Sequence, residues 1–188
     1  PDEAWHIDAT AIRLLDGSKV YLHAVIDNFS RRILAWKVAD TPTPATTCEI
    51  LTAAARTAGL ATDTPPTVYA DSGSENVNHA VDALIATGLF RRFLAQVDVR
   101  FSNSMIEAWW RSLEHQWLFL HSLNSPQDVR RLVAFYVAEH NTAMPHPAFH
   151  GQTPDEMYRG TGQAVPAQLE EARRAAREAR LAANRATS

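Results

Sequence analysis

The first forty residues alternate between short apolar runs and turn residues. Two β-tolerant runs, 5–11 and 21–26, flank an Asp16-Gly17 pair, which is a strong signal for a tight hairpin turn. A third run at 33–38 follows a second polar turn at 27–31. The pattern therefore predicts a meander of three antiparallel strands.

After residue 40 the apolar spacing changes to that of helices separated by short strands. Thr43 followed by Pro44 predicts a helix start, and Gly59 predicts its end. Strands feeding helices after a meander predict an α/β fold, with a mixed five-stranded sheet flanked by helices on both faces. The remaining expected elements are strands at 67–70 and 90–94 and helices at 76–87, 103–121, from 126, from Thr153 to near Gly160, and at 166–185.

The helical periodicity changes character near residue 160. A capping box at Thr153 and Glu156 opens the last helix with core-like residues, and the segment 166–185 is Ala, Arg and Glu with few large apolar residues. We expect a globular domain over residues 1–160 and an Ala/Arg-rich helical extension over 161–188. Three Trp on the helix at 103–121 are expected in the core, with base stacking as the less favoured alternative.

Composition restricts the class of protein. The chain has 188 residues with 46% hydrophobic content, a single Cys48 and no apolar run long enough to cross a bilayer, which is typical of an intracellular domain with one core. The formal net charge is −3, so any binding of nucleic acid must use local Arg clusters. Because the chain starts at Pro1, we expect it to be a piece of a longer protein.

Three carboxylates stand where this fold would bring them together. Asp8 lies within an apolar strand, Asp71 follows the short strand at 67–70, and Glu107 lies on a helix, with 35 residues between it and Asp71. An acid in an apolar strand is costly unless a cation or a hydrogen bond compensates it. Hard divalent cations take carboxylate oxygens and keep positions open for water and phosphate, so the three acids predict a phosphoryl-transfer site.

Other polar residues are interpreted as structural residues and not as site residues. Asp16 and Asp27 are interpreted as turn acids, since one precedes Gly in a hairpin and the other precedes Asn at a strand end. His6 shares a strand face with Asp8, and a packed or hydrogen-bonded histidine is favoured over a substrate contact. No spacing of Cys and His indicates zinc.

Several motifs in order resemble one family. They are Trp5-x-x-Asp8-x-Thr10, Ile26-Asp27-x-Phe29-Ser30-Arg31, Asp71-Ser72-Gly73-Ser74-Glu75, the 35-residue gap to Glu107, and His140-Asn141 through Pro145-His146 to Gly151-x-Thr153-Pro154-x-Glu156. Over residues 4 to 160 the chain resembles the catalytic core of the retroviral-integrase superfamily, in particular DDE-type bacterial insertion-sequence transposases and integrases with an RNase H-like fold.

The resemblance implies an activity and a metal. Asp8, Asp71 and Glu107 would be catalytic and would bind two ions of Mg²⁺ or Mn²⁺. The implied reaction is DNA cleavage and strand transfer during transposition, in which water and then a freed 3′-hydroxyl attack phosphodiesters. The implied partners are DNA ends, target DNA and further copies of the chain, with an upstream DNA-binding domain missing and a location at the bacterial nucleoid in the cytoplasm.

The chain departs from the family pattern at three positions. Related transposases have Lys or Arg seven residues after the catalytic Glu, and here this position is Glu114. Ser102 replaces Asp in the usual Asp-Asn pair, and Met144 replaces an Arg. The residues expected to contact DNA are Asn103, Arg111, Glu114, His115 and His146. Two alternative functions follow: an RNase H-like nuclease without strand transfer, and a catalytically weakened module for DNA binding or assembly.

Overall fold

The computed structural model describes residues 1–60, 64–94 and 104–186. Its strands form one five-stranded sheet in the order β3-β2-β1-β4-β5. β1 lies at the centre, as the position of Asp8 required. The strand bounds are β1 Ala4–Arg13, β2 Lys19–Asp27, β3 Ile33–Ala39, β4 Thr67–Ala70 and β5 Arg91–Leu94.

The sheet combines an antiparallel meander with two parallel strands. β1 pairs antiparallel with β2 from Trp5↔Asp27 to Arg13↔Lys19, and β2 pairs antiparallel with β3. β4 runs parallel to β1, and β5 runs parallel to β4. Gly17 adopts a φ of +88° in the first hairpin, which glycine adopts without a steric penalty. The predicted fold class is confirmed.

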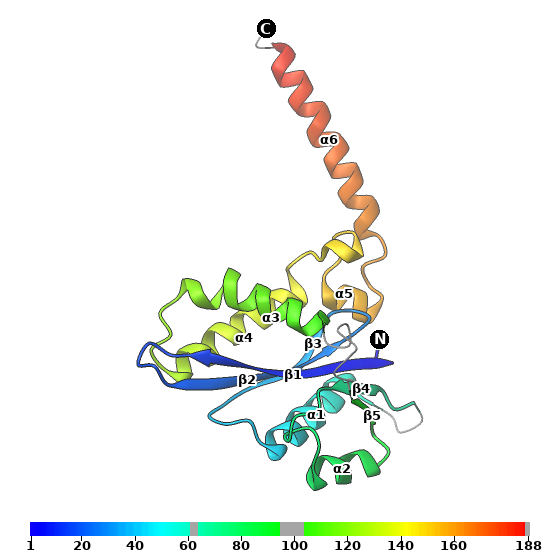
Figure 1. The fold of residues 1–188 in the computed structure, drawn as a ribbon. Coiled ribbons are helices and arrows are strands. Elements are labelled where there is room, and N and C mark those ends of the chain that lie inside the picture. Colours follow the sequence, from blue (N-terminus) through cyan, green and yellow to red (C-terminus); the bar gives the residue numbers. More distant parts are fainter. Residues whose placement is uncertain (61–63, 95–103, 187–188) are drawn as a thin grey trace. The chain divides into compact units, whose positions relative to one another are not determined.

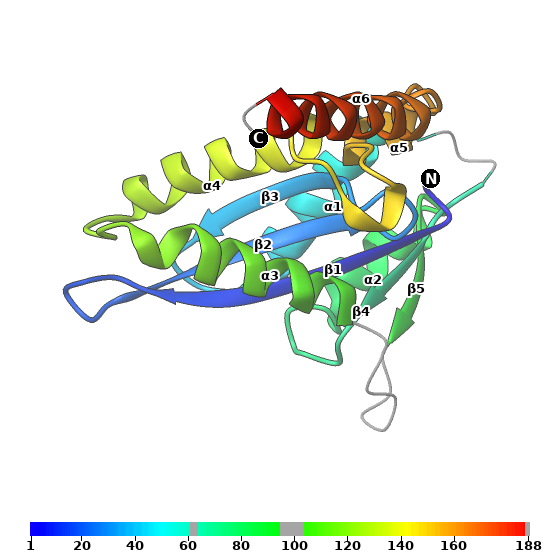
Figure 2. The same cartoon turned by 90° about the horizontal axis from the view of Figure 1, so that it is seen from above.

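Helices cover both faces of the sheet (Figures 1 and 2). α1 and α2 lie on one face, and α3 and α4 lie on the other. The helix bounds are α1 Pro44–Ala58, α2 His79–Ala86, α3 Ser104–Gln116, α4 Pro126–Thr142, α5 Pro154–Arg159 and α6 Val165–Ala186, with short 3₁₀ turns η1 at Leu118–Leu120 and η2 at Pro147–Phe149.

The larger core lies between the sheet and helices α3 and α4. Trp109, Trp110 and Leu113 of α3 are buried there against strand residues such as Leu22, and Trp117 is partly buried at the rim. This confirms the interpretation of the three Trp as packing residues. Burial of so many large apolar side chains fixes α3 over the sheet, which is what positions Glu107.

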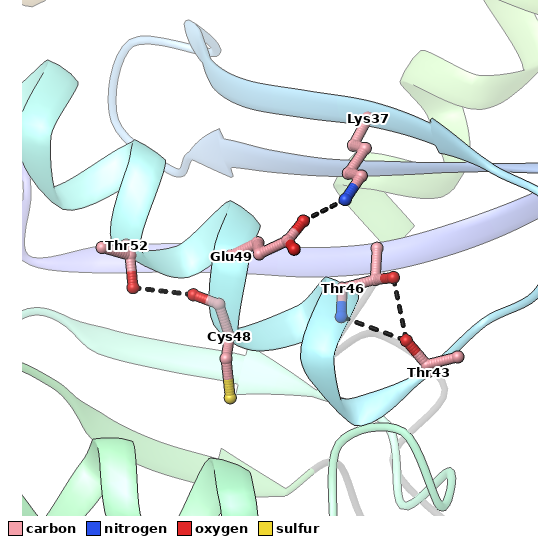
Figure 3. A network of polar contacts seen from close by, with 6 residues as sticks. All are labelled: Lys37, Thr43, Thr46, Cys48, Glu49 and Thr52. Carbon is pink, nitrogen blue, oxygen red and sulfur yellow. Dashed lines mark hydrogen bonds and ion pairs between the residues drawn. The ribbon is translucent and has the colours of Figure 1, made fainter.

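A capping hydrogen bond fixes the start of α1, and an ion pair joins its exposed side to β3. Thr43 caps the helix by accepting a hydrogen bond from the Thr46 N–H at 3.2 Å, and Gly59 ends the helix with a φ of +63°. Figure 3 shows this cap together with the ion pair between Lys37 of β3 and Glu49 of α1. The predicted bounds of this helix are confirmed.

Two predicted helices differ in length from the observed ones. α2 starts at His79 and not at 76, because the Asn78 side chain accepts from the Val81 N–H and caps the helix there. Val77 lies within the predicted range of 76–87 but precedes the observed helix and is exposed. α3 ends at Gln116, because Trp117 leaves helical geometry with φ −138° and ψ −68° before η1.

The chain forms two compact units, residues 1–138 and 139–188. Within the second, Thr153 and Glu156 make the predicted reciprocal capping box at the start of α5. The side chains of residues 170–185 in α6 are exposed all around, in agreement with the absence of an apolar stripe. The expected domain boundary at residue 160 stays a prediction. Within the described ranges, no helix combines the length and apolar character needed to span a bilayer.

Candidate active site

The site is built on one face of β1. Side chains alternate along a strand, so Asp8 and Thr10 point to the same side of the sheet. α3 lies over that side, because the Trp110 indole N–H donates to Asp8 Oδ2 at 3.0 Å and the Thr10 hydroxyl donates to Glu114 Oε1 at 2.8 Å. Two hydrogen bonds thus fix the helix against the strand beside the first acid.

Asp8 is a half-buried carboxylate with both oxygens hydrogen-bonded. Its Oδ1 accepts from the Ala9 N–H at 2.8 Å, and its Oδ2 accepts from Trp110. Each carboxylate oxygen has two lone pairs, so each keeps one for another ligand. The side chain is therefore held in place without being saturated.

The electrostatics of Asp8 link the three predicted acids. The pKa of Asp8 is raised from 3.8 to about 6: burial is the largest cause, the hydrogen bonds from Ala9 and Trp110 oppose it, and the charges of Asp71 and Glu107 add to it. Carboxylates repel one another measurably only over short distances. Residues from β1, from the end of β4 and from α3 thus converge on one region.

Asp71 is exposed and held by the loop that follows β4. Its Oδ1 accepts from the Gly73 N–H at 3.1 Å and from the Asn76 side-chain amide at 2.6 Å. Asn76 is only 5% exposed, and its backbone carbonyl oxygen accepts from Arg92 of β5 at 3.0 Å. Arg92 also pairs with Asp82 of α2 at 2.7 Å. The orientation of Asp71 is therefore supported by a buried amide that is itself anchored.

Glu107 lies in the first turn of α3 and is exposed. A carboxylate in this position is stabilised by the positive end of the helix dipole. Trp110 follows three residues later and therefore shares its helix face, which is the face turned toward Asp8. The packing of α3 thus delivers Glu107 to the region of Asp8.

The three carboxylates are ligands of the kind that a hard cation prefers, although their side chains do not form a closed metal site. Three carboxylates and no thiolate favour Mg²⁺ or Mn²⁺ over soft metals. In residues 1–60, 64–94 and 104–186, no group of three acids, His or Cys stands ready to hold a metal ion. The pKa of Asp8 is raised mainly by burial and to a lesser extent by the charges of Asp71 and Glu107, and a bound cation would favour its ionised form.

The residues expected to contact DNA are dispersed. Arg111 and His115 are exposed on α3, and the His115 ring packs edge-on against Phe119 at 5.4 Å. Glu114 is half-buried and bonded to Thr10, which the sequence pattern did not indicate. His146 belongs to the second unit, where its Nδ1 accepts from the Ala148 N–H at 3.2 Å. Asn103 lies outside the described residues.

Two site residues were missed from the sequence. Trp110 was interpreted as a core residue, and it is one, but its indole N–H also orients Asp8. Asn76 was counted as part of a predicted helix, and its buried amide instead orients Asp71 from the loop before α2. Their spacing was the available signal: Trp110 stands one turn after Glu107, and Asn76 stands five residues after Asp71.

Comparisons with known proteins identify the family and the fold. The integrase core domain family matches residues 1–127. No curated protein matches the sequence. The HTLV-2 integrase catalytic core, solved with magnesium in a trimeric form, is similar with a TM-score of 0.68 and 15% identity, over 84% of this chain and 97% of that chain.

Two further structures share the fold. The simian T-cell lymphotropic virus intasome in complex with PP2A regulatory subunit B56 gamma matches with a TM-score of 0.68 and 16% identity, over 84% of this chain and 54% of that chain. The BIV integrase catalytic core domain matches with a TM-score of 0.62 and 14% identity, over 88% of this chain and 99% of that chain. At these identities the likeness concerns the fold.

Proposed function

Because this chain belongs to the integrase core domain family, we propose that it is the catalytic domain of a DDE-type transposase or integrase that cleaves DNA and transfers strands. The observation that carries the proposal is geometric: Trp110 bonds α3, which carries Glu107, to Asp8 on β1, and β1 pairs with β4, which ends just before Asp71. A shared acidic site on an RNase H-like sheet is suited to phosphodiester chemistry.

The proposed metal ligands are Asp8, Asp71 and Glu107. Two ions of Mg²⁺ or Mn²⁺ would activate the attacking oxygen and stabilise the leaving oxygen of the phosphodiester. The magnesium complex of the HTLV-2 core supports the choice of a hard ion.

The remaining residues of the site act by positioning. Trp110 and the Ala9 N–H hold Asp8, and Asn76 and the Gly73 N–H hold Asp71, so two of the three acids are oriented before substrate arrives. Hydrolysis at the end of the element leaves a 3′-hydroxyl. In joining, that oxygen loses its proton, bonds to a target phosphorus and displaces the target's 3′-oxygen, so no covalent enzyme intermediate is needed.

The proposed partners are DNA and further copies of the chain. Arg111 and His115 are exposed on α3 and are proposed to contact phosphates, together with Asn103 and His146. Assembly on DNA is supported by the intasome similarity, since joining two ends to a target requires more than one active site. A place at the bacterial nucleoid belongs to the same proposal.

One observation favours a second candidate function. Glu114 stands where related transposases carry a cation, and this favours the alternative of a catalytically weakened module for DNA binding or assembly. The other alternative is a nuclease of the same fold, which differs from a strand transferase because it does not use a 3′-hydroxyl as a nucleophile.

An oligonucleotide assay separates them. The substrate is a labelled duplex that copies the DNA flanking the gene, mixed with plasmid target and Mg²⁺. We expect the 3′-hydroxyl duplex to become covalently joined to the plasmid, and the same duplex ending in a 3′-dideoxynucleotide to give no joined product. Cleavage without any joined product from the 3′-hydroxyl duplex would establish the nuclease and refute strand transfer.

A further inference from the structure

Three aromatic rings form a row across the sheet on the side that carries the acids. His6 of β1 stands directly opposite Tyr69 of β4, and Tyr69 stands directly opposite Phe93 of β5. The His6 and Tyr69 rings are stacked with centroids 5.1 Å apart and an angle of 20° between the planes. The Tyr69 and Phe93 rings are 5.2 Å apart and tilted by 46°.

This row runs beside the acids. His6 precedes Asp8 by two residues on β1 and so shares its face, and Tyr69 precedes Asp71 by two residues at the end of β4. The aromatic row and the acids are therefore two adjacent lines on one surface. A DNA strand that crosses the acids along β4 and β5 would have neighbouring nucleotides beside the rings.

The row is anchored at one end and open at the other. His6 is 7% exposed and its Nε2 lies 3.2 Å from Asn28 Oδ1, whereas Phe93 is 48% exposed at the edge strand. In Figure 2, which views this side of the sheet, α3 follows β1 and leaves β5 uncovered by α3 and α4. Tyr69 and Phe93 thus present an accessible aromatic surface, and the sheet beneath them holds it in place.

A cation stands next to the open end. Arg91 is exposed and shares a strand face with Phe93, since the two are separated by one residue of β5. One terminal nitrogen of Arg91 donates to the Pro65 carbonyl at 3.1 Å, which orients the guanidinium and leaves its other N–H groups as donors. Surfaces that bind single strands combine such a cation for the backbone with aromatic rings for the bases.

We propose that Tyr69 and Phe93 form a stacking platform for bases of an unpaired DNA strand next to the acidic site. The inference rests on the proposed function, because DNA is assigned to the platform on the ground that the platform adjoins the acidic site. Stacking needs an accessible π-face and not a base-specific contact, so the platform would favour a frayed or single-stranded end over a paired one. Aromatic rows also stabilise sheets, and the test must separate the two roles.

The test compares substitutions at two equally exposed phenylalanines of the full chain. Phe93→Ala removes the platform, Phe93→Leu keeps apolar area without the π-face, and Phe93→Trp enlarges the π-face. Phe135 in α4 is 52% exposed, stacks on Trp117, and serves as the matched control through Phe135→Ala and Phe135→Leu. The probes are an oligo-dT strand, a blunt duplex of the same length, and a single strand carrying 2-aminopurine.

The expected result is selective for the unpaired strand. Phe93→Ala should weaken oligo-dT binding about tenfold and Phe93→Leu nearly as much, while duplex binding changes less than about twofold. Phe93→Trp should restore or strengthen binding, and 2-aminopurine should be quenched by the wild type and not by Phe93→Ala. The Phe135 variants should match the wild type.

The opposite results would overturn the inference. They are an equal loss of strand and duplex binding at position 93, equal effects at positions 93 and 135, or a lowered melting temperature with unchanged affinity, which would indicate a purely structural row. Metal-dependent cleavage by the wild type is measured on the same DNA. Its absence would refute the proposed function, whereas the binding comparison bears on the platform alone.

Discussion

Asp8 is ionised at a cost in the metal-free protein. Burial and the charges of Asp71 and Glu107 raise its pKa to about 6. Between about pH 4 and pH 6, Asp8 is therefore largely protonated in the folded protein and largely ionised in the unfolded chain. Asp8 therefore has no effect on stability below about pH 4, and it destabilises the fold increasingly as pH rises through about 6.

We accordingly expect Asp8→Asn to raise the melting temperature without metal at about pH 8 and to leave it unchanged at about pH 4. A pKa of about 6 in place of 3.8 corresponds to at most about 3 kcal/mol, and the lost acceptor for the Ala9 N–H reduces this. Thermal unfolding at both pH values measures the change. Asp16→Asn is the control, because hydrogen bonds from Ser18 lower the pKa of Asp16. Equal stabilisation by Asp8→Asn at the two pH values would contradict the account.

Residues with a motif were predictable from the sequence, and residues with a supporting role were not. Asp8, Asp71 and Glu107 stand at a recognisable order and spacing. The tasks of Trp110 and Asn76 depend on single hydrogen bonds, and periodicity shows only that a residue is buried, not where its polar atom points. The same limit applies to Glu114, whose bond to Thr10 joins residues 104 positions apart.

At the scale of the elements, α3 determines the site. Its buried Trp and Leu residues hold it on the sheet, and its bonds to Asp8 and Thr10 set its position along β1. The caps at Thr43, Gly59 and Thr153 were predictable because each depends on neighbouring residues alone. The early end of α3 was not, because the apolar spacing continues through η1 while the backbone turns at Trp117.

The charge on α3 leads to a prediction about DNA binding. Glu114→Lys removes a carboxylate and adds a cation on the face shared with Glu107, so affinity for DNA should rise. The log-log salt dependence of binding should steepen by about one for each phosphate that the new cation neutralises. Glu114→Gln keeps an acceptor for Thr10 and should give an intermediate affinity.

Glu178→Lys is the control for bulk charge, because Glu178 is exposed on α6. Fluorescence anisotropy over a range of salt concentrations measures affinity and slope for all three variants. If Glu114→Lys and Glu178→Lys strengthen binding equally, only net charge matters, and the proposed placement of α3 along DNA has to be abandoned.

At the scale of the whole molecule, the sheet order brings distant segments together. Placing β1 between β2 and β4 sets Asp8 beside the carboxyl end of β4, where Asp71 follows. This arrangement was predictable because an antiparallel meander followed by strands alternating with helices restricts the topology. The separation of residues 139–188 as a compact unit depends on the density of packing, which the sequence pattern does not reveal.

The measurement that tests the central claim most directly is metal-dependent cleavage by variants of the three acids. Asp8→Asn, Asp71→Asn and Glu107→Gln are compared with wild type and with Asp16→Asn, an exposed turn acid, on one labelled DNA duplex. Each variant of the three acids should lose about a thousandfold or more in rate with Mg²⁺ or Mn²⁺, since bound ions supply several kcal/mol of transition-state stabilisation. Asp16→Asn should retain wild-type activity, and excess EDTA should abolish all cleavage. Near-wild-type rates in any variant of the three acids, or full wild-type activity in EDTA, would contradict the account.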